Sequence, residues 1–297
     1  MMRKSGGLLV FVLSAGVLIL QHAAFLLTAA AGQVSHPATL RIASAATPDI
    51  PYAEYEFQVE QELLQRANQS RQRAAAPALT LDSGLTAAAR VHAQAMLEAN
   101  QLSHQFTGEP TLVQRLAATT RLQLDQAAEN VALDYSAQGG HEHLMLSPPH
   151  RANLLNPAYN VVGLGVVRSG DRLFIVEDFA HALPAYSIDE VKGHIAAAVN
   201  RMRHDSGRPS LPRHDLTNAD SIACSMARAD KLGTTSVRDL AGRYTVLTYT
   251  SLHPEALPIE ASHAIRSPNL RSFSVGTCYA RTQTYPTGVH WIVLSLQ

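Results

Sequence analysis

The residues most able to do chemistry gather between positions 128 and 155, in "AENVALDYSAQGGHEHLMLSPPHRANLL". The histidines and acids there, with one more histidine upstream in "LSHQF", are His104, Glu129, His141, Glu142, His143 and His150. Imidazole and carboxylate are ligands that suit Zn²⁺, and they are also the common general acids and bases. A polar helix face is the structural alternative. No HExxH or CxxC pattern is present, so spacing alone does not identify a metal site.

The overall charge argues against one class of partner. Lys plus Arg and Asp plus Glu number 24 each, which gives a formal net charge of zero. A chain without excess positive charge does not attract the phosphate backbone over long range. We therefore expect no nucleic-acid partner. The 46% hydrophobic content is typical of a globular protein.

The N-terminus has the pattern of an export signal. Arg3 and Lys4 precede an apolar run from Leu8 to Leu20, and small residues follow at 29–31. Residues 1–31 are therefore predicted to be a signal peptide that is cleaved or an anchor that is kept, and either one makes the protein secreted or part of the cell envelope. We expect contact with a membrane only through this segment, if it is uncleaved. Residues 32–53 are rich in Ala, Ser, Thr and Pro, which predicts a flexible linker.

The chain has two cysteines, Cys224 and Cys278. In an exported protein they could form one disulfide that closes a long loop, whereas the alternative is two buried free thiols.

From residue 54 onward, hydrophobic periodicity predicts an ordered domain. The segment "YEFQVEQELLQRANQSRQR" has apolar residues at helical spacing, and "LDSGLTAAARVHAQAMLEAN" repeats the pattern behind Asp82 or Ser83 as the N-cap. The runs "VVGLGVV" and "RLFIVEDFA" flank "RSGD", which predicts a β-hairpin.

The second half of the chain repeats this order. Asn68, Arg71, Pro77 and Leu79 recur as Asn200, Arg203, Pro209 and Leu211, at a constant offset of 132 residues. The run "VVGLG" at 161–165 recurs as "SVGTC" at 274–278, and "LFIV" at 173–176 as "HWIV" at 290–293. The later offsets are smaller because the second copy lacks the part that holds the histidines. We therefore predict that residues 187–297 are a degenerate copy of the scaffold without its site; two unrelated domains are the alternative.

Several of these motifs, in order, resemble the CAP superfamily. They are the stretch from "LLQRANQSRQR" to "RVHAQAM", "SH" at 103–104, "AEN" at 128–130, "SPPHRANLLNP" at 147–157, "VVGLGVV" and "IVEDFA". The superfamily includes the cysteine-rich secretory proteins, antigen 5 and the plant pathogenesis-related proteins, and this chain is similar to its bacterial, cysteine-poor branch. The resemblance covers about residues 57–181, within a domain that we place at 54–183.

The resemblance implies an α+β fold, an α-β-α sandwich with an antiparallel sheet between helical layers, and an open cleft. Many members bind zinc or another divalent cation in that cleft. By motif, His104 and His150 match the two cleft histidines and the candidate metal ligands, and Glu129 matches the first acid. Glu142 is a candidate for the second acid, on a looser alignment.

Some positions have plainer interpretations or depart from the family. His92 lies on an apolar stripe and is expected to be a core residue with its hydrogen bonds made. Glu142 is expected in the first turn of a helix, and Asp178 is expected to face solvent or to pair with an arginine. Bacterial relatives commonly have Trp at the position of Leu144 and Gln at that of Glu177, so both changes bear on what the cleft accepts.

Three functions follow from these observations. The first is an exported binding module whose cleft holds a divalent metal and a small or lipid-like ligand. The alternative is a metal-dependent hydrolase of an envelope polymer or peptide, although no serine or cysteine nucleophile stands in a recognisable setting. A purely structural role, with the two halves packed together, is the third.

Overall fold

The computed structural model describes residues 12–13 and 55–297. The predicted signal segment and linker therefore lie outside the described residues, apart from strand β1 (Val12–Leu13), which pairs parallel with β6. Within the described ranges, no helix combines the length and apolar character needed to cross a membrane.

The first half, from Tyr55 to Ala182, folds as helices around one sheet. The helices are α1 (Phe57–Arg73), α2 (Ser83–Ala99), α3 (Leu112–Thr119), α4 (Ala137–Leu146) and α5 (Pro148–Leu155). The strands are β2 (Thr80–Leu81), β3 (Leu124–Asp134), β4 (Val161–Ser169) and β5 (Arg172–Ala182), in the spatial order β2-β4-β5-β3. The predicted hairpin is confirmed, since β4 and β5 pair antiparallel around Gly170.

Local sequence explains where the helices begin and end. Asp82 caps α2 by accepting a hydrogen bond from the backbone N–H of Leu85 at 2.8 Å, and Asn100 ends the helix in the left-handed conformation. Thr111 and Gln114 form a capping box at the start of α3. The expected position of Glu142 was wrong, because Ser136 caps α4 and places Glu142 beyond its first turn.

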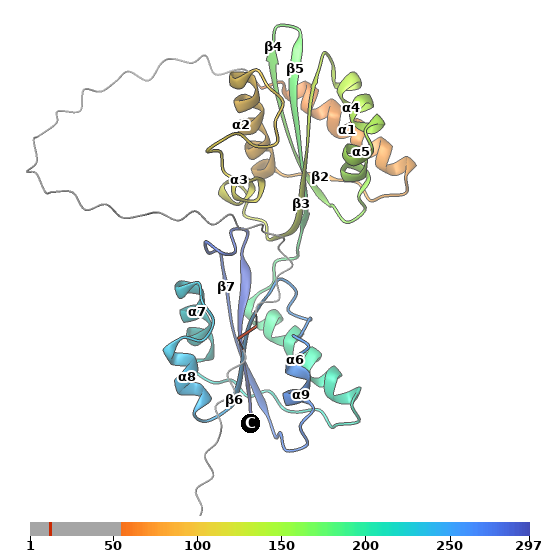
Figure 1. Cartoon of the computed structure of the whole chain (residues 1–297). Coiled ribbons are helices and arrows are strands. Elements are labelled where there is room, and N and C mark those ends of the chain that lie inside the picture. Colours follow the sequence, from red (N-terminus) through yellow and green to blue (C-terminus); the bar gives the residue numbers. More distant parts are fainter. Residues whose placement is uncertain (1–11, 14–54) are drawn as a thin grey trace, which may run out of the picture. The chain divides into compact units, whose positions relative to one another are not determined.

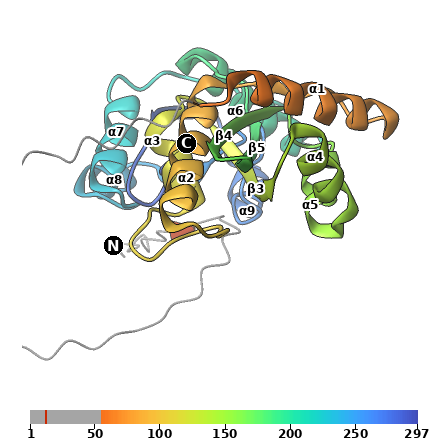
Figure 2. The ribbon, with the colours of Figure 1, turned by 90° about the horizontal axis from the view of Figure 1, so that it is seen from above.

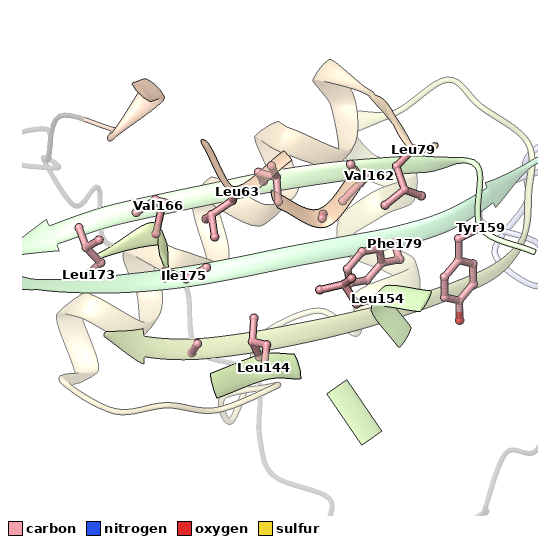
Figure 3. Close-up of a cluster of buried hydrophobic side chains, with 14 residues drawn as sticks. Leu63, Leu79, Leu144, Leu154, Tyr159, Val162, Val166, Leu173, Ile175 and Phe179 are labelled. Atoms are coloured by element: carbon pink, nitrogen blue, oxygen red, sulfur yellow. The ribbon is translucent and has the colours of Figure 1, made fainter. Parts of the chain in front are cut away.

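The elements form three layers, with α1, α4 and α5 on one face of the sheet and α2 and α3 on the other (Figures 1 and 2). Leu63 of α1, Leu144 of α4 and Leu154 of α5 pack against β4 and β5 in one core cluster (Figure 3). On the opposite face α2 lies directly on β4, because a Cβ at Gly163 or Gly165 would clash with the α2 backbone. An α+β layered fold is thus confirmed.

The second half has the same kind of architecture. Its helices are α6 (Ile188–His204), α7 (Ala219–Ala229), α8 (Thr235–Ala241) and α9 (Ala261–Ile265). Its strands are β6 (Thr245–Ser251), β7 (Phe273–Ala280) and β8 (Val289–Leu296), in the order β6-β8-β7. Helices α6 and α9 pack against one face of the sheet and α7 and α8 against the other (Figure 1).

The residues that share the offset of 132 make the same contacts in both halves. Asn68 exchanges two hydrogen bonds with the backbone of Leu79, and Asn200 does so with Leu211. Arg71 is fully buried and its guanidinium donates to backbone carbonyls, including that of Pro77. Arg203 is also buried and makes the matching hydrogen bond to Pro209.

The predicted correspondence between 173–176 and 290–293 is wrong by two residues. Gly163 and Gly276 are placed alike, since each abuts the backbone of the helix beside it, α2 or α7. Gly163 lies opposite Asp178 and Gly276 opposite Val293, so residues 290–293 correspond to 175–178. A slip of two keeps every side chain on the same face of a strand, so the apolar pattern does not detect it.

Cys224 of α7 and Cys278 of β7 form a disulfide. The predicted disulfide is therefore confirmed, and the alternative of two free thiols is excluded. The bridge ties the helix to the sheet across a sequence separation of 54 residues.

Candidate functional site

The first predicted pair of site residues lies at the edge of the first sheet. Glu129 lies on β3, the edge strand, and its side chain is only 4% exposed. His104 lies in the loop between α2 and α3, and its side chain is 58% exposed. The ring Nδ1 donates a hydrogen bond of 2.9 Å to Oε1 of Glu129. A buried carboxylate therefore orients an exposed imidazole and leaves Nε2 free for a ligand.

His150 reaches the same edge from the opposite layer. It is half-buried on α5. Burial lowers the pKa of its ring, and the electrostatic interaction with His104 acts in the same direction. The two imidazoles therefore lie close enough to affect each other, although their sequence positions are far apart.

Two asparagines anchor α5 to β3. The Asn130 amide donates to the backbone carbonyl of His150 at 3.1 Å, and Asn153 donates to the Asn130 side-chain carbonyl at 3.0 Å. The helix that carries His150 is thereby fixed beside the strand that carries Glu129.

Glu142 does not join this arrangement. It is exposed on α4, and its carboxylate accepts a hydrogen bond from Gln138 at 2.8 Å. Within the described part of the chain, no hydrogen bond links it to His104, Glu129 or His150.

The other two histidines of the segment also lie elsewhere. His141 is buried, and its Nε2 hydrogen-bonds to the Ser70 hydroxyl at 2.8 Å. His143 is 71% exposed, and its Nδ1 donates to Asp134 at 2.6 Å. Because His143 is oriented by an acid just as His104 is, it provides a matched control for the site.

Ring nitrogens are donors that suit a divalent cation, and a pair of them would leave further positions to water or to a ligand. Among the residues described, no group of three or more His, Cys, Asp or Glu side chains is placed to hold a metal ion. Such a two-imidazole site is more open than a structural zinc site, which has four protein ligands.

Two further acids lie behind the site on β5, and both are fully buried. Burial raises the pKa of Glu177 to about 7, although a hydrogen bond from Asn130 at 3.2 Å opposes the shift. Burial also raises the pKa of Asp178 well above its usual range, and the negative charge of Glu129 adds to this effect. The expected solvent-facing position of Asp178 was therefore wrong.

Sequence reasoning missed Glu109 and Arg115 altogether. Arg115 forms an ion pair with Glu129 and lies 3.5 Å from Glu109. The signal for Asp178 was present, because "FIVEDFA" places two acids inside an otherwise apolar strand, where charges need buried partners. No comparable signal marks Glu109, which lies in a polar loop.

Comparison with known proteins bears on the first half. The profile of the family described as "Cysteine-rich secretory protein family", CAP, matches residues 64–179. No curated protein matches the chain.

Several solved structures are similar to parts of the chain. An outer surface protein from Borrelia burgdorferi is 18% identical over 42% of this chain and 94% of its own, with a TM-score of 0.40. An extracellular protein containing an SCP domain from Bacillus anthracis is 27% identical over 42% of this chain, with a TM-score of 0.38, and the match spans only 41% of that protein. Na-ASP-1 is 9% identical over 80% of this chain and 89% of its own, with a TM-score of 0.41. With TM-scores below 0.5, these similarities carry no functional inference.

Proposed function

Since residues 64–179 form a domain of the cysteine-rich secretory protein (CAP) family, we propose that the chain is an exported binding protein. Its cleft at the β3 edge holds a divalent cation, zinc in the first instance, between His104 and His150. A small or lipid-like ligand then binds at the open side of that cation.

One observation carries this proposal: the buried carboxylate of Glu129 orients the exposed ring of His104, and the ring of His150, on a helix anchored to the same strand by Asn130, interacts electrostatically with His104. The Glu129 carboxylate accepts from Nδ1 of His104, which selects the tautomer whose Nε2 can bind a metal. Burial lowers the pKa of His150, which favours the neutral ring that a metal ligand requires.

A metal-dependent hydrolase is the alternative function, but less supports it. Both cysteines are consumed by the disulfide, so no thiol nucleophile is available. Glu129 already accepts hydrogen bonds from His104 and Arg115, which suits a positioning group better than a general base. We therefore favour binding over catalysis.

Residues 187–297 are proposed to be a degenerate second copy that supplies scaffold and no site. In support, the strand registers align the second sheet with the first. The residues at the positions of Glu129, Asn130, Glu177 and Asp178 are Thr248, Tyr249, Ile292 and Val293. Ligand binding by the second half would contradict this part of the proposal.

The location that we propose is outside the cytoplasm, either secreted or in the cell envelope. The N-terminal pattern at 1–31 supports export. The disulfide supports it independently, because such bonds persist in oxidising compartments and are rare in the cytosol.

Zinc titration of the full chain by calorimetry at neutral pH tests the proposal. We expect micromolar binding in the wild-type chain, loss of binding in His104→Ala and in His150→Ala, and unchanged binding in His143→Ala. The last variant removes an exposed, acid-paired histidine that makes no hydrogen bond to His104, Glu129 or His150 among the described residues. Binding that survives in the double variant of His104 and His150 would refute the site.

A further inference from the structure

Five ionisable side chains lie together behind His104 in the first half. They come from α2, the loop that follows it, α3, β3 and β5. This set, called the acid-base cluster below, consists of His92, Glu109, Arg115, Glu129 and Asp178.

Both ring nitrogens of His92 make hydrogen bonds in this cluster. It is fully buried, and its Nδ1 lies 2.6 Å from a carboxylate oxygen of Glu109, while its Nε2 lies 2.8 Å from the backbone carbonyl of Ser103. A carbonyl only accepts, so Nε2 donates. Nδ1 also donates if Glu109 is ionised, which makes the ring a cation.

The surroundings of Glu109 keep it ionised. Burial opposes ionisation, but hydrogen bonds from the Phe106 backbone and from His92, with the charge of Arg115, lower its pKa below the usual value. Its second oxygen accepts the Phe106 N–H at 2.9 Å. The cluster therefore contains the cations His92 and Arg115 and the anion Glu109.

Glu129 is the second anion. Arg115 donates to one of its oxygens and His104 to the other, and Nε2 of His92 lies 3.8 Å away. The charges of the cations His92 and Arg115 are therefore already balanced by those of the anions Glu109 and Glu129. A third negative charge in this buried space would lie against Glu129, and the only opposing charge, that of Arg115, is already paired with Glu129 and Glu109 among the described residues, so a third charge is costly.

Asp178 is the third acid, directly opposite Glu129 on the neighbouring strand. It is fully buried, and neither of its oxygens accepts a hydrogen bond from any described residue. A carboxylate needs donors, whereas a protonated carboxyl supplies one. Glu129 is the acceptor that the register places beside it.

We propose that Asp178 is held in the protonated form at neutral pH and donates its proton in a hydrogen bond to Glu129. The cluster is then electroneutral, and Glu129 stays fixed between Arg115, Asp178 and the exposed ring of His104. Asp178 is thus a positioning residue of the cleft, acting through Glu129. Consistently, the second sheet has Thr248 and Val293 in place of this acid pair.

Infrared spectroscopy of the full chain tests the protonation without any substitution. Aspartate is labelled with ¹³C at the side-chain carboxyl, and the spectrum is recorded at neutral pH. We expect a carbonyl band of a protonated carboxyl that shifts with the label, is lost in Asp178→Asn and is kept in Glu177→Gln. No label-sensitive band would overturn the proposal and would mean that Asp178 is ionised beside Arg115.

Zinc affinity tests the positioning role, and this arm rests on the proposed function. In Asp178→Asn the amide can still donate to Glu129, so we expect affinity within about threefold of wild type, whereas Asp178→Ala should lose about tenfold or more. Equal losses in both variants, or none in Asp178→Ala, would refute positioning. If the wild-type chain binds no zinc, the proposed function fails, while the infrared result still decides the protonation.

Discussion

Replacing Glu177 with glutamine should change how the stability of the chain depends on pH. The carboxyl is fully buried, and its pKa is raised from 4.5 to about 7. At 1.36 kcal/mol per pKa unit, this rise corresponds to about 3 kcal/mol of stability.

The sign follows from which state holds the proton. Between the unfolded and folded pKa values, the unfolded chain has released the proton that the folded chain retains. Raising the pH therefore favours unfolding, and the free energy of unfolding falls by up to about 1.4 kcal/mol per pH unit until the folded group also ionises near 7. Glutamine cannot ionise, so this contribution disappears in Glu177→Gln, while its carbonyl can still accept from Asn130.

Chemical denaturation measures the effect as a difference between two curves. The stability of Glu177→Gln relative to wild type should rise by about 3 kcal/mol from about pH 4.5 to about pH 8. Glu62→Gln, at an exposed carboxylate paired with Arg66, serves as the control and should run parallel to wild type. Parallel curves for Glu177→Gln as well would refute the buried-acid reasoning.

Two further substitutions test the scaffold. Replacing Cys224 and Cys278 with serine should lower the free energy of unfolding by about 4 kcal/mol, because the disulfide closes a loop of 54 residues. Adding reductant during denaturation should destabilise the wild-type chain by the same amount and leave the serine variant unchanged. Replacing Arg71 or Arg203 with methionine should lower the free energy of unfolding of the half that carries it by about 3 kcal/mol or more, because each guanidinium donates to several backbone carbonyls that would lose their donors. Denaturation monitored separately in each half measures this loss. An unchanged free energy of unfolding would contradict the role of these arginines.

Much of the scaffold could be predicted from sequence because its signals are local. The cap at Asp82 and the hairpin at Gly170 depend on neighbours in the chain, and both appear where expected. Asn68 and Arg71 recur with their partners at one offset because each fixes a short loop that follows its own helix.

The site was less accessible to sequence reasoning because its contacts cross layers. The motif identified His104 and Glu129, which the structure joins by a hydrogen bond. The motif did not predict that Glu142 is exposed on its helix. It also did not predict that Asp178 is buried opposite Glu129. Strand pairing, rather than composition, determines which acids share a buried space.

The most direct test of the central claim is a crystal structure of the chain soaked with zinc, with anomalous scattering recorded at the zinc edge. We expect an anomalous peak about 2.0–2.1 Å from Nε2 of His104 and from a ring nitrogen of His150. An empty cleft beside a peak at His143 or elsewhere would contradict it.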